Sequence, residues 1–125
     1  MILFWRRKAS YGQRGEDIAA RHLRRQGYTI LERNARFGKY EIDIIAREGD
    51  TVAFVEVKTR RSNDVTAPED SVGFTKQRHI QYAAERYCAL HPDPEAYYRF
   101  DVVSVILPDE GKPCVTLLRN AFVAR

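Results

Sequence analysis

The sequence predicts an α/β domain in which helices flank a mixed β-sheet, with the element order α-β-β-β-α-β-β. Two segments carry apolar residues at helical spacing, and five short runs are rich in β-branched and aromatic residues. Turn-forming residues separate these segments, and elements in this order typically form one sheet with helices packed against it. The length of 125 residues and the 44% apolar content favour a single domain spanning residues 1–125.

The first predicted helix begins after a cap at Ser10 and ends at about Gln26, with Gly27 as its stop. Residues 1–9 precede this helix and are expected to be mobile or to lie on a neighbouring surface. They do not resemble a signal peptide, because the apolar run is short and the basic residues follow it. The expected buried stripe of the helix consists of Ile18, Ala19, His22 and Leu23.

Three strands are predicted next, and the last two form a hairpin. A turn at Asn34–Lys39 separates the first strand from the second, and residues 48–50 form the hairpin turn. The predicted strands are Tyr28–Arg33, Tyr40–Arg47 and Thr51–Arg60.

The second half of the chain begins with a polar loop, Arg61–Val72, which has no periodicity. A helix is predicted from Phe74 or Thr75 to a point before Pro92. Its apolar residues recur at helical spacing, which predicts a core-facing stripe of Ile80, Ala83, Ala84, Tyr87 and Cys88. The last two predicted strands are Tyr97–Leu107 and Val115–Leu118.

The basic residues are concentrated at the start of the chain. Residues 1–39 hold ten Lys or Arg and three Asp or Glu, a net of +7, whereas residues 40–125 hold eleven and fourteen, a net of −3. A basic region beside an acidic one suits a polyanionic substrate. An ordinary solvated helix face rich in arginine would give the same count, and charge alone does not separate the two readings.

Composition also bears on location and redox state. Cys88 and Cys114 belong to no C-x-x-C pair and read as reduced, semi-buried thiols. No apolar run approaches the length needed to span a membrane. We therefore expect a cytoplasmic protein without a membrane partner.

Charged residues within two apolar strands are the most informative motif. Asp43 lies in the first strand of the predicted hairpin, while Glu56 and Lys58 lie in the second. Side chains two positions apart on a strand point to the same face, so two carboxylates and an ammonium are expected to converge. Buried acids that repel each other are stabilised by a divalent cation between them. This is a D…E-x-K pattern, typical of metal-dependent phosphodiester cleavage.

The predicted cofactor is Mg²⁺, with Mn²⁺ as a substitute, because hard cations prefer oxygen ligands. Asp43 and Glu56 would supply carboxylates, and the Val57 carbonyl a third oxygen. The metal would polarise the phosphate and activate water, while Lys58 would orient that water or neutralise developing charge. The alternative is a surface Glu–Lys pair of little energetic value. We favour the metal site, because Asp43 and the alternating apolar residues accompany the pair.

The chain resembles the YraN family of small bacterial proteins, part of the PD-(D/E)xK, restriction-endonuclease-like superfamily. It is similar, more distantly, to archaeal Holliday-junction resolvases, which pair a helix glutamate with the same D…E-x-K motif. One departure is Tyr40, where the family usually has glycine. The stretches that carry the resemblance are Gly15-Glu16, Gly27-Tyr28, Ile30–Asn34, Glu41–Ala46, Phe54–Arg60, Arg99–Val103 and Asn120–Phe122. The resemblance implies a restriction-endonuclease-like fold and nuclease activity.

Three further acids have two readings each. Glu16, placed in the first turn of the first helix, would either complement the helix dipole or act as a third carboxylate of the site, as the resemblance suggests. Glu41 shares a face with Asp43 on a regular strand and would assist it, or would pair with Arg60. Asp101 is flanked by apolar residues in a strong strand and would be catalytic or have a buried hydrogen-bonding role, of which the buried role is favoured.

The candidate nucleic-acid contacts are basic residues of the helices and of one strand end. Lys76 and Arg78 open the second helix, where cations oppose the helix dipole, so phosphate contacts would explain them. A solvated helix start is the equal alternative, and the loop before it would be a substrate-gripping flap or an idle surface loop. The candidates are Arg14, Arg21, Arg24, Arg25, Arg60, Lys76 and Arg78.

The sequence therefore favours a Mg²⁺-dependent endonuclease acting on DNA, with branched or flapped structures as candidate substrates. The alternative is a non-catalytic nucleic-acid-binding or scaffolding protein that keeps the nuclease fold. DNA is favoured over RNA as the partner, and the protein is expected to be a monomer or a homodimer.

Overall fold

The computed structural model describes residues 10–61 and 72–124, and it confirms the predicted order of helices and strands. The expectations for residues 1–9 and for most of the polar loop lie outside these described residues. The elements are α1 (Tyr11–Arg25), β1 (Thr29–Phe37), β2 (Tyr40–Glu48), β3 (Thr51–Arg60), α2 (Phe74–Leu90), β4 (Tyr97–Ile106) and β5 (Cys114–Phe122).

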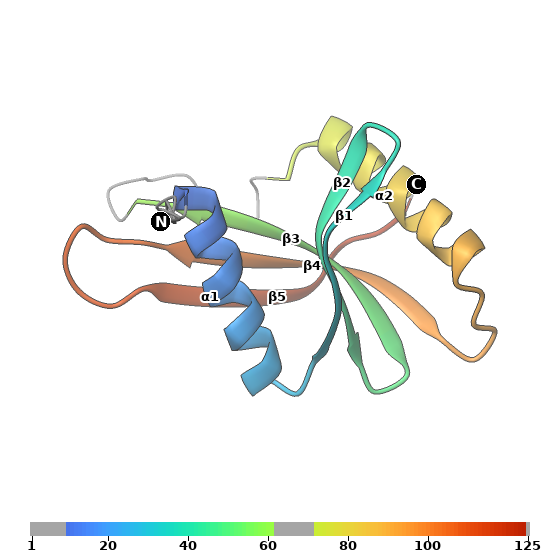
Figure 1. Cartoon of the computed structure of the whole chain (residues 1–125), viewed down its shortest axis with the longest axis horizontal. Helices are drawn as coiled ribbons and strands as arrows, with labels where there is room; N and C mark the ends of the chain where they lie inside the picture. Colours follow the sequence, from blue (N-terminus) through green and yellow to red (C-terminus); the bar gives the residue numbers. More distant parts are fainter. Residues whose placement is uncertain (1–9, 62–71, 125) are drawn as a thin grey trace, which may run out of the picture.

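All five strands belong to one mixed sheet with the spatial order β1-β2-β3-β4-β5 (Figure 1). The β1–β2, β2–β3 and β4–β5 pairs are antiparallel. β3 and β4 are parallel, and α2 lies in the connection between them, as parallel neighbours require.

The sheet divides between β2 and β3. These two strands pair only from Glu48↔Thr51 to Ile44↔Val55. Beyond that point β2 stays with β1 as far as its first residue, and β3 stays with β4 to its last residue. Figure 1 shows the β1–β2 hairpin turning away from β3, β4 and β5. We call the opening between Tyr40–Asp43 and Glu56–Arg60 the fork.

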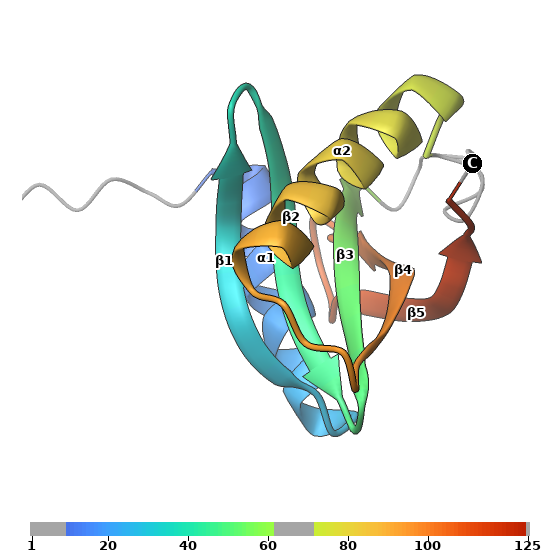
Figure 2. The same cartoon turned by 90° about the vertical axis from the view of Figure 1, so that its right-hand side faces the viewer.

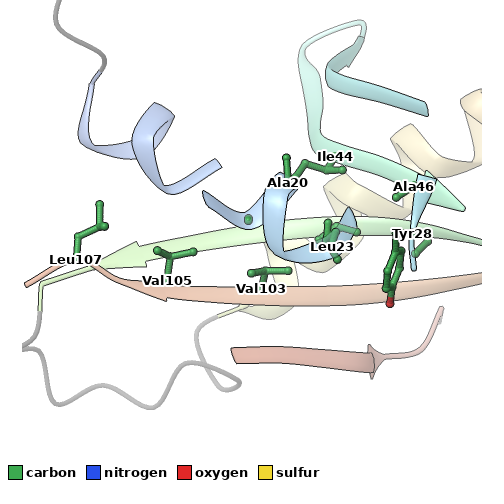
Figure 3. Close-up of a cluster of buried hydrophobic side chains, with 11 residues drawn as sticks. Ala20, Leu23, Tyr28, Ile44, Ala46, Val103, Val105 and Leu107 are labelled. Carbon is green, nitrogen blue, oxygen red and sulfur yellow. The ribbon is translucent and has the colours of Figure 1, made fainter. Parts of the chain in front are cut away.

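The two helices cover opposite faces of the sheet, with α2 in front of it and α1 behind it in Figure 2. On the α1 face, Leu23 packs on β-branched residues of the central strands, and Tyr28 closes the cluster (Figure 3). On the α2 face, Ile80 and Tyr87 pack against Phe54. Each helix thus buries one apolar stripe against the sheet, as its periodicity predicted.

The α1 stripe is shifted from the predicted one. The Ser10 cap is confirmed, since its hydroxyl accepts a hydrogen bond from the Gln13 amide at 3.1 Å. Ile18 packs against the core as predicted but is only half-buried, and His22 is half-buried where a buried residue was expected. Small residues face the sheet because α1 lies close to β3: a Cβ at Gly15 would overlap the Thr59 side chain. The buried residues of α1 are Gly15, Ala19, Ala20 and Leu23.

The predicted turn at Asn34–Lys39 is also wrong in extent. β1 continues to Phe37, and only Gly38 and Lys39 form the turn, with Gly38 at φ +64°. Asn34 adopts φ +52° within the strand, a left-handed conformation that Asn tolerates better than most residues. Asn34 does not end the strand, because β1 keeps the same register with β2 from Arg33↔Ile44 to Ala35↔Ile42.

Two expectations drawn from composition meet the structure directly. Both cysteines are free, but Cys114 is exposed, whereas the prediction had both semi-buried. Within residues 10–61 and 72–124, no helix is long and apolar enough to cross a membrane.

Candidate functional site

The fork brings Asp43 and Glu56 together. Each is the first residue beyond the last β2–β3 pair, Ile44↔Val55. Where a ladder hydrogen bond would have continued, the Asp43 carboxylate instead accepts one from the Val57 amide, at 2.8 Å. Because the two strands diverge here, backbone hydrogen bonds between them end, and the space between the strands holds the two carboxylates.

Both carboxyl groups are held in an environment that disfavours their charge. The Glu56 side chain is 7% exposed, and burial, followed by the nearby Asp43 charge, raises its pKa to about 8. Burial also raises the pKa of Asp43, although the Val57 hydrogen bond opposes this. The Glu56 Oε2 atom is buried and has no hydrogen-bond partner in the described part of the chain. This acid pair is therefore incompletely satisfied by the protein.

Two lysines approach Glu56 from different elements. Lys76, in the first turn of α2, places its Nζ 3.7 Å from Glu56 Oε1. The charge of Lys58 on β3 lowers the pKa of Glu56, more weakly than that of Lys76. The sequence singled out Lys76 only as a phosphate contact, because nothing local shows that the start of α2 folds over the fork.

Glu16 approaches the same acids from α1. It lies in the second helical turn and not in the first as predicted, which removes the first-turn dipole explanation. Burial and then the Asp43 charge raise its pKa. Because Gly15 lets α1 lie against β3, the next residue is carried to the fork. Arg33 lies 4.0 Å from the Glu16 carboxylate and partly balances it.

Asn34 links two of these acids, and sequence reasoning had assigned it only to a turn. With its amide oriented to satisfy hydrogen bonding, its nitrogen donates to Glu16 Oε1 at 2.8 Å and to Glu41 Oε1 at 3.0 Å. Glu41 pairs with Arg36 at 3.3 Å, and not with Arg60 as the sequence suggested. The local sign of this role is the positive φ of Asn34, and a backbone dihedral angle cannot be read from a sequence.

The fork has a donor set that fits a hard divalent cation. The Asp43 and Glu56 carboxylates supply two oxygens, and the unpartnered Glu56 Oε2 is a site that a cation would satisfy. The Val57 amide faces Asp43, and in a strand the carbonyl of a residue points to the same side as its amide. Among the described residues no three Asp, Glu, His or Cys side chains gather as a metal site. The Val57 carbonyl would add a third protein oxygen to the two carboxylates, and water would complete the coordination of such a cation.

The predicted nucleic-acid contacts divide into exposed and buried residues. Four are exposed on α1: Arg14, Arg21, Arg24 and Arg25. Arg21 and Arg25 line a cavity of about 270 Å³ with Lys112 of the β4–β5 connection. Arg78 is exposed on α2. Arg60 differs, because two of its guanidinium nitrogens are buried and lack hydrogen-bond partners among the described residues.

Asp101 has the buried hydrogen-bonding role expected of it. It is 0% exposed and accepts hydrogen bonds from the Tyr28 hydroxyl, from Arg99 and from the Asn120 amide. Arg99 in turn donates to Glu48 at 2.7 Å. This network joins four segments on the α1 side of the sheet and uses none of the acids at the fork.

Comparison with known proteins identifies the family. The model of Uncharacterised protein family UPF0102 matches residues 15–105, a range that contains the acids and lysines of the fork. A UPF0102 protein of Caldicellulosiruptor saccharolyticus is 42% identical over 92% of this chain and 98% of its own length. One of Parafrankia sp. is 48% identical over 89% of this chain and 94% of its own. The chain therefore belongs to the UPF0102 family.

Proposed function

We propose that this protein is a metal-dependent endonuclease that hydrolyses phosphodiester bonds in DNA, with branched or flapped DNA among its substrates. The observation that carries the proposal is the pair of carboxylates at the fork, half-buried Asp43 and buried Glu56, with Lys58 two residues after Glu56 on β3. The order of motifs that resembles the YraN family and the PD-(D/E)xK superfamily supports the same reading.

Each residue of the fork has a chemical role in this proposal. Asp43, Glu56 and the Val57 carbonyl hold the cation, and the Asp43–Val57 hydrogen bond fixes the first carboxylate. A bound Mg²⁺ supplies electrophilic activation of the phosphate and of the attacking water. Lys58 orients that water or neutralises the charge that develops on the phosphate. Glu16, with its raised pKa, is placed to accept a proton from the water.

The basic residues supply the electrostatic part of substrate binding. The exposed arginines of α1 and the cavity that two of them line attract phosphates without selecting a base sequence. The acids of the fork repel the scissile phosphate until a cation is bound. In this proposal the exposed arginines provide the affinity for DNA, and the residues of the fork carry out the cleavage.

One contact favours a second candidate, a nucleic-acid-binding protein without turnover. Lys76 already places a cation 3.7 Å from Glu56, so an ammonium can neutralise the acid pair without a metal. In an active nuclease this lysine would have to yield to a metal or move to the phosphate. In a non-catalytic protein it would stay with Glu56.

Cleavage separates the two candidates. We would incubate the protein with duplex, single-stranded, flap and four-way DNA and with RNA, in Mg²⁺, Mn²⁺ or EDTA. Asp43→Asn, Glu56→Gln and Lys58→Ala should each reduce single-turnover cleavage by about 10²–10³-fold, because each removes one electrostatic contributor. Glu110→Gln, at an exposed turn, is the matched control and should cleave as wild type does.

Metal-free binding sharpens the assignment. Above the Glu56 pKa of about 8, Glu56→Gln should bind DNA as tightly as wild type or more so, because a negative charge near the phosphate is then lost, whereas Lys58→Ala should bind more weakly. Wild-type protein that binds DNA but cleaves none of the substrates with any divalent metal would favour the non-catalytic candidate. Full activity in Lys58→Ala would end the assignment of that lysine.

A further inference from the structure

The outer face of α2 carries an alternating series of aromatic and arginine side chains. Phe74, Arg78, Tyr82 and Arg86 follow one another at every fourth position, so neighbours lie side by side on the helix. Phe74 is 53% exposed and Tyr82 is 40% exposed. The Arg78 guanidinium lies 5.9 Å from the Phe74 ring centroid, and that of Arg86 lies 5.2 Å from the Tyr82 centroid. We call these four residues the α2 stripe.

Tyr40 of the β1–β2 hairpin packs against α2 beside the α2 stripe. The Tyr40 ring stacks on His79 with 4.2 Å between centroids and meets the edge of Tyr82 at 5.3 Å. The Lys39 ammonium lies 5.4 Å from the Tyr40 centroid. The hairpin and the helix enclose a cavity of about 440 Å³, lined by Tyr40, Phe74, Thr75, Arg78, His79 and Tyr82.

The cavity adjoins the fork through both of its walls. Tyr40 lies three residues before Asp43 on β2. On α2, His79 lies three residues after Lys76, which contacts Glu56, and three residues are about 4.5 Å of helix. A nucleotide next to a phosphate held at the fork would therefore reach the aromatic rings.

The lining suits an unpaired nucleotide. Its aromatic rings offer faces for stacking, which every base accepts, and Arg78 and the neighbouring Lys39 offer cations for phosphates. None of the six lining residues is acidic. In a duplex the base faces are covered by stacking on their neighbours, so only an unpaired strand can use such rings.

We propose that the α2 stripe, with Tyr40 and His79, binds an unpaired DNA strand that leads away from the fork. This inference rests on the proposed nuclease function and narrows its substrate to DNA with a single-stranded segment beside the scissile bond. The base nearest the cut stacks in the cavity, and the strand continues along α2. The arginines between the aromatic rings contact its phosphates.

The test measures binding without divalent metal, so that it does not depend on catalysis. Fluorescence anisotropy with a labelled oligothymidine should show about tenfold weaker binding for Tyr82→Ala, the scale of one lost base–aromatic stack. Tyr82→Phe keeps the ring and should bind as wild type does. Tyr97→Ala is the matched control. Tyr97 is 67% exposed and pairs with Thr51 at the start of β3, whereas the fork lies at the other end of that strand.

Phe74→Ala provides a second, independent variant at an exposed position and should also weaken binding. Melting temperatures check that each variant is folded. Equal affinity of Tyr82→Ala, Phe74→Ala and Tyr97→Ala for the single strand would overturn the proposal. So would wild-type affinity for blunt duplex equal to that for a single strand of the same length.

Cleavage then separates the failure of this inference from the failure of the proposed function. Single-strand binding that requires Tyr82, without cleavage of any substrate, supports the α2 stripe and ends the nuclease proposal. Cleavage of flap DNA that requires Asp43 but is unchanged in Tyr82→Ala and Phe74→Ala supports the nuclease and overturns the α2 stripe.

Discussion

Glu56 and Asp101 are buried acids on adjacent strands, but their surroundings treat them in opposite ways. In the β3–β4 register, Asp101 pairs with Val55, the residue immediately before Glu56. Asp101 receives hydrogen bonds from a hydroxyl, a guanidinium and a backbone amide. Glu56 has one lysine at 3.7 Å and one oxygen with no partner in the described chain, and a second acid lies beside it.

The comparison separates an acid that the fold satisfies fully from one that it satisfies only in part. Burial alone does not mark a site, because Asp101 is the more buried of the two. The difference is that the protein surrounds Asp101 with hydrogen-bond donors, whereas Glu56 has a lysine at 3.7 Å and one buried oxygen without a hydrogen-bond partner among the described residues. An acid whose ionised form the fold disfavours is a candidate for binding a cation.

The largest expected effect is on stability at the satisfied acid. Asp101→Asn leaves Arg99 without its buried counter-charge and should lower the free energy of unfolding by about 3–5 kcal/mol. Glu56→Gln removes a carboxyl whose ionised form the fold disfavours and should leave that free energy unchanged or raise it. Urea unfolding at pH 7 without divalent metal measures both.

If Asp101→Asn and Glu56→Gln lower the free energy of unfolding by the same amount, the distinction between the two acids fails. Glu110→Gln, at an exposed turn, is the reference for a change without structural consequence.

The second effect is a dependence of stability on pH. The pKa of Glu56 is about 8 in the folded protein against an ordinary value of 4.5, so the folded state binds more protons than the unfolded state between these values. Its contribution is complete below about pH 4.5 and is lost as pH rises to 8. The free energy of unfolding should therefore fall by about 2–4 kcal/mol from pH 5 to pH 8 relative to Glu56→Gln.

Urea unfolding of both proteins in EDTA across this range measures the difference. Parallel pH profiles for wild type and Glu56→Gln would show that the carboxyl titrates as an ordinary surface glutamate does.

The third effect tests whether a cation completes the unsatisfied pair. Mg²⁺ or Mn²⁺ at a hundredfold excess over its Kd should stabilise the wild-type protein by about 2.7 kcal/mol through mass action. Asp43→Asn should lose this stabilisation, while Asp109→Asn, at an exposed turn, should keep it. Melting curves with and without metal provide the measurement. Equal metal responses in wild type and Asp43→Asn would remove Asp43 from the proposed ligands.

Much of the fold could be predicted because its signals are local. The Ser10 cap, the core-facing apolar residues of α2 from Ile80 to Tyr87 and the apolar runs of β2 and β3 each lie within a few residues of sequence. Local signals failed where a residue suits two structures. Asn34 is favourable in a turn, yet it lies inside β1 with a positive φ, because pairing with β2 continues on both sides of it.

The sequence by itself determined the order of the elements and placed Asp43, Glu56 and Lys58 on adjoining strands, because periodicity and spacing are properties of the chain. Only the tertiary structure decided which acids were left unsatisfied. The sheet divides between β2 and β3, Gly15 lets α1 bring Glu16 close to the fork, and Lys76 lies beside Glu56. Each of these arrangements brings together residues that are distant in sequence. Whether a buried acid finds hydrogen-bond donors and counter-charges depends on these long-range contacts. For this reason Asp101 belongs to the core, whereas Glu56 belongs to the candidate site.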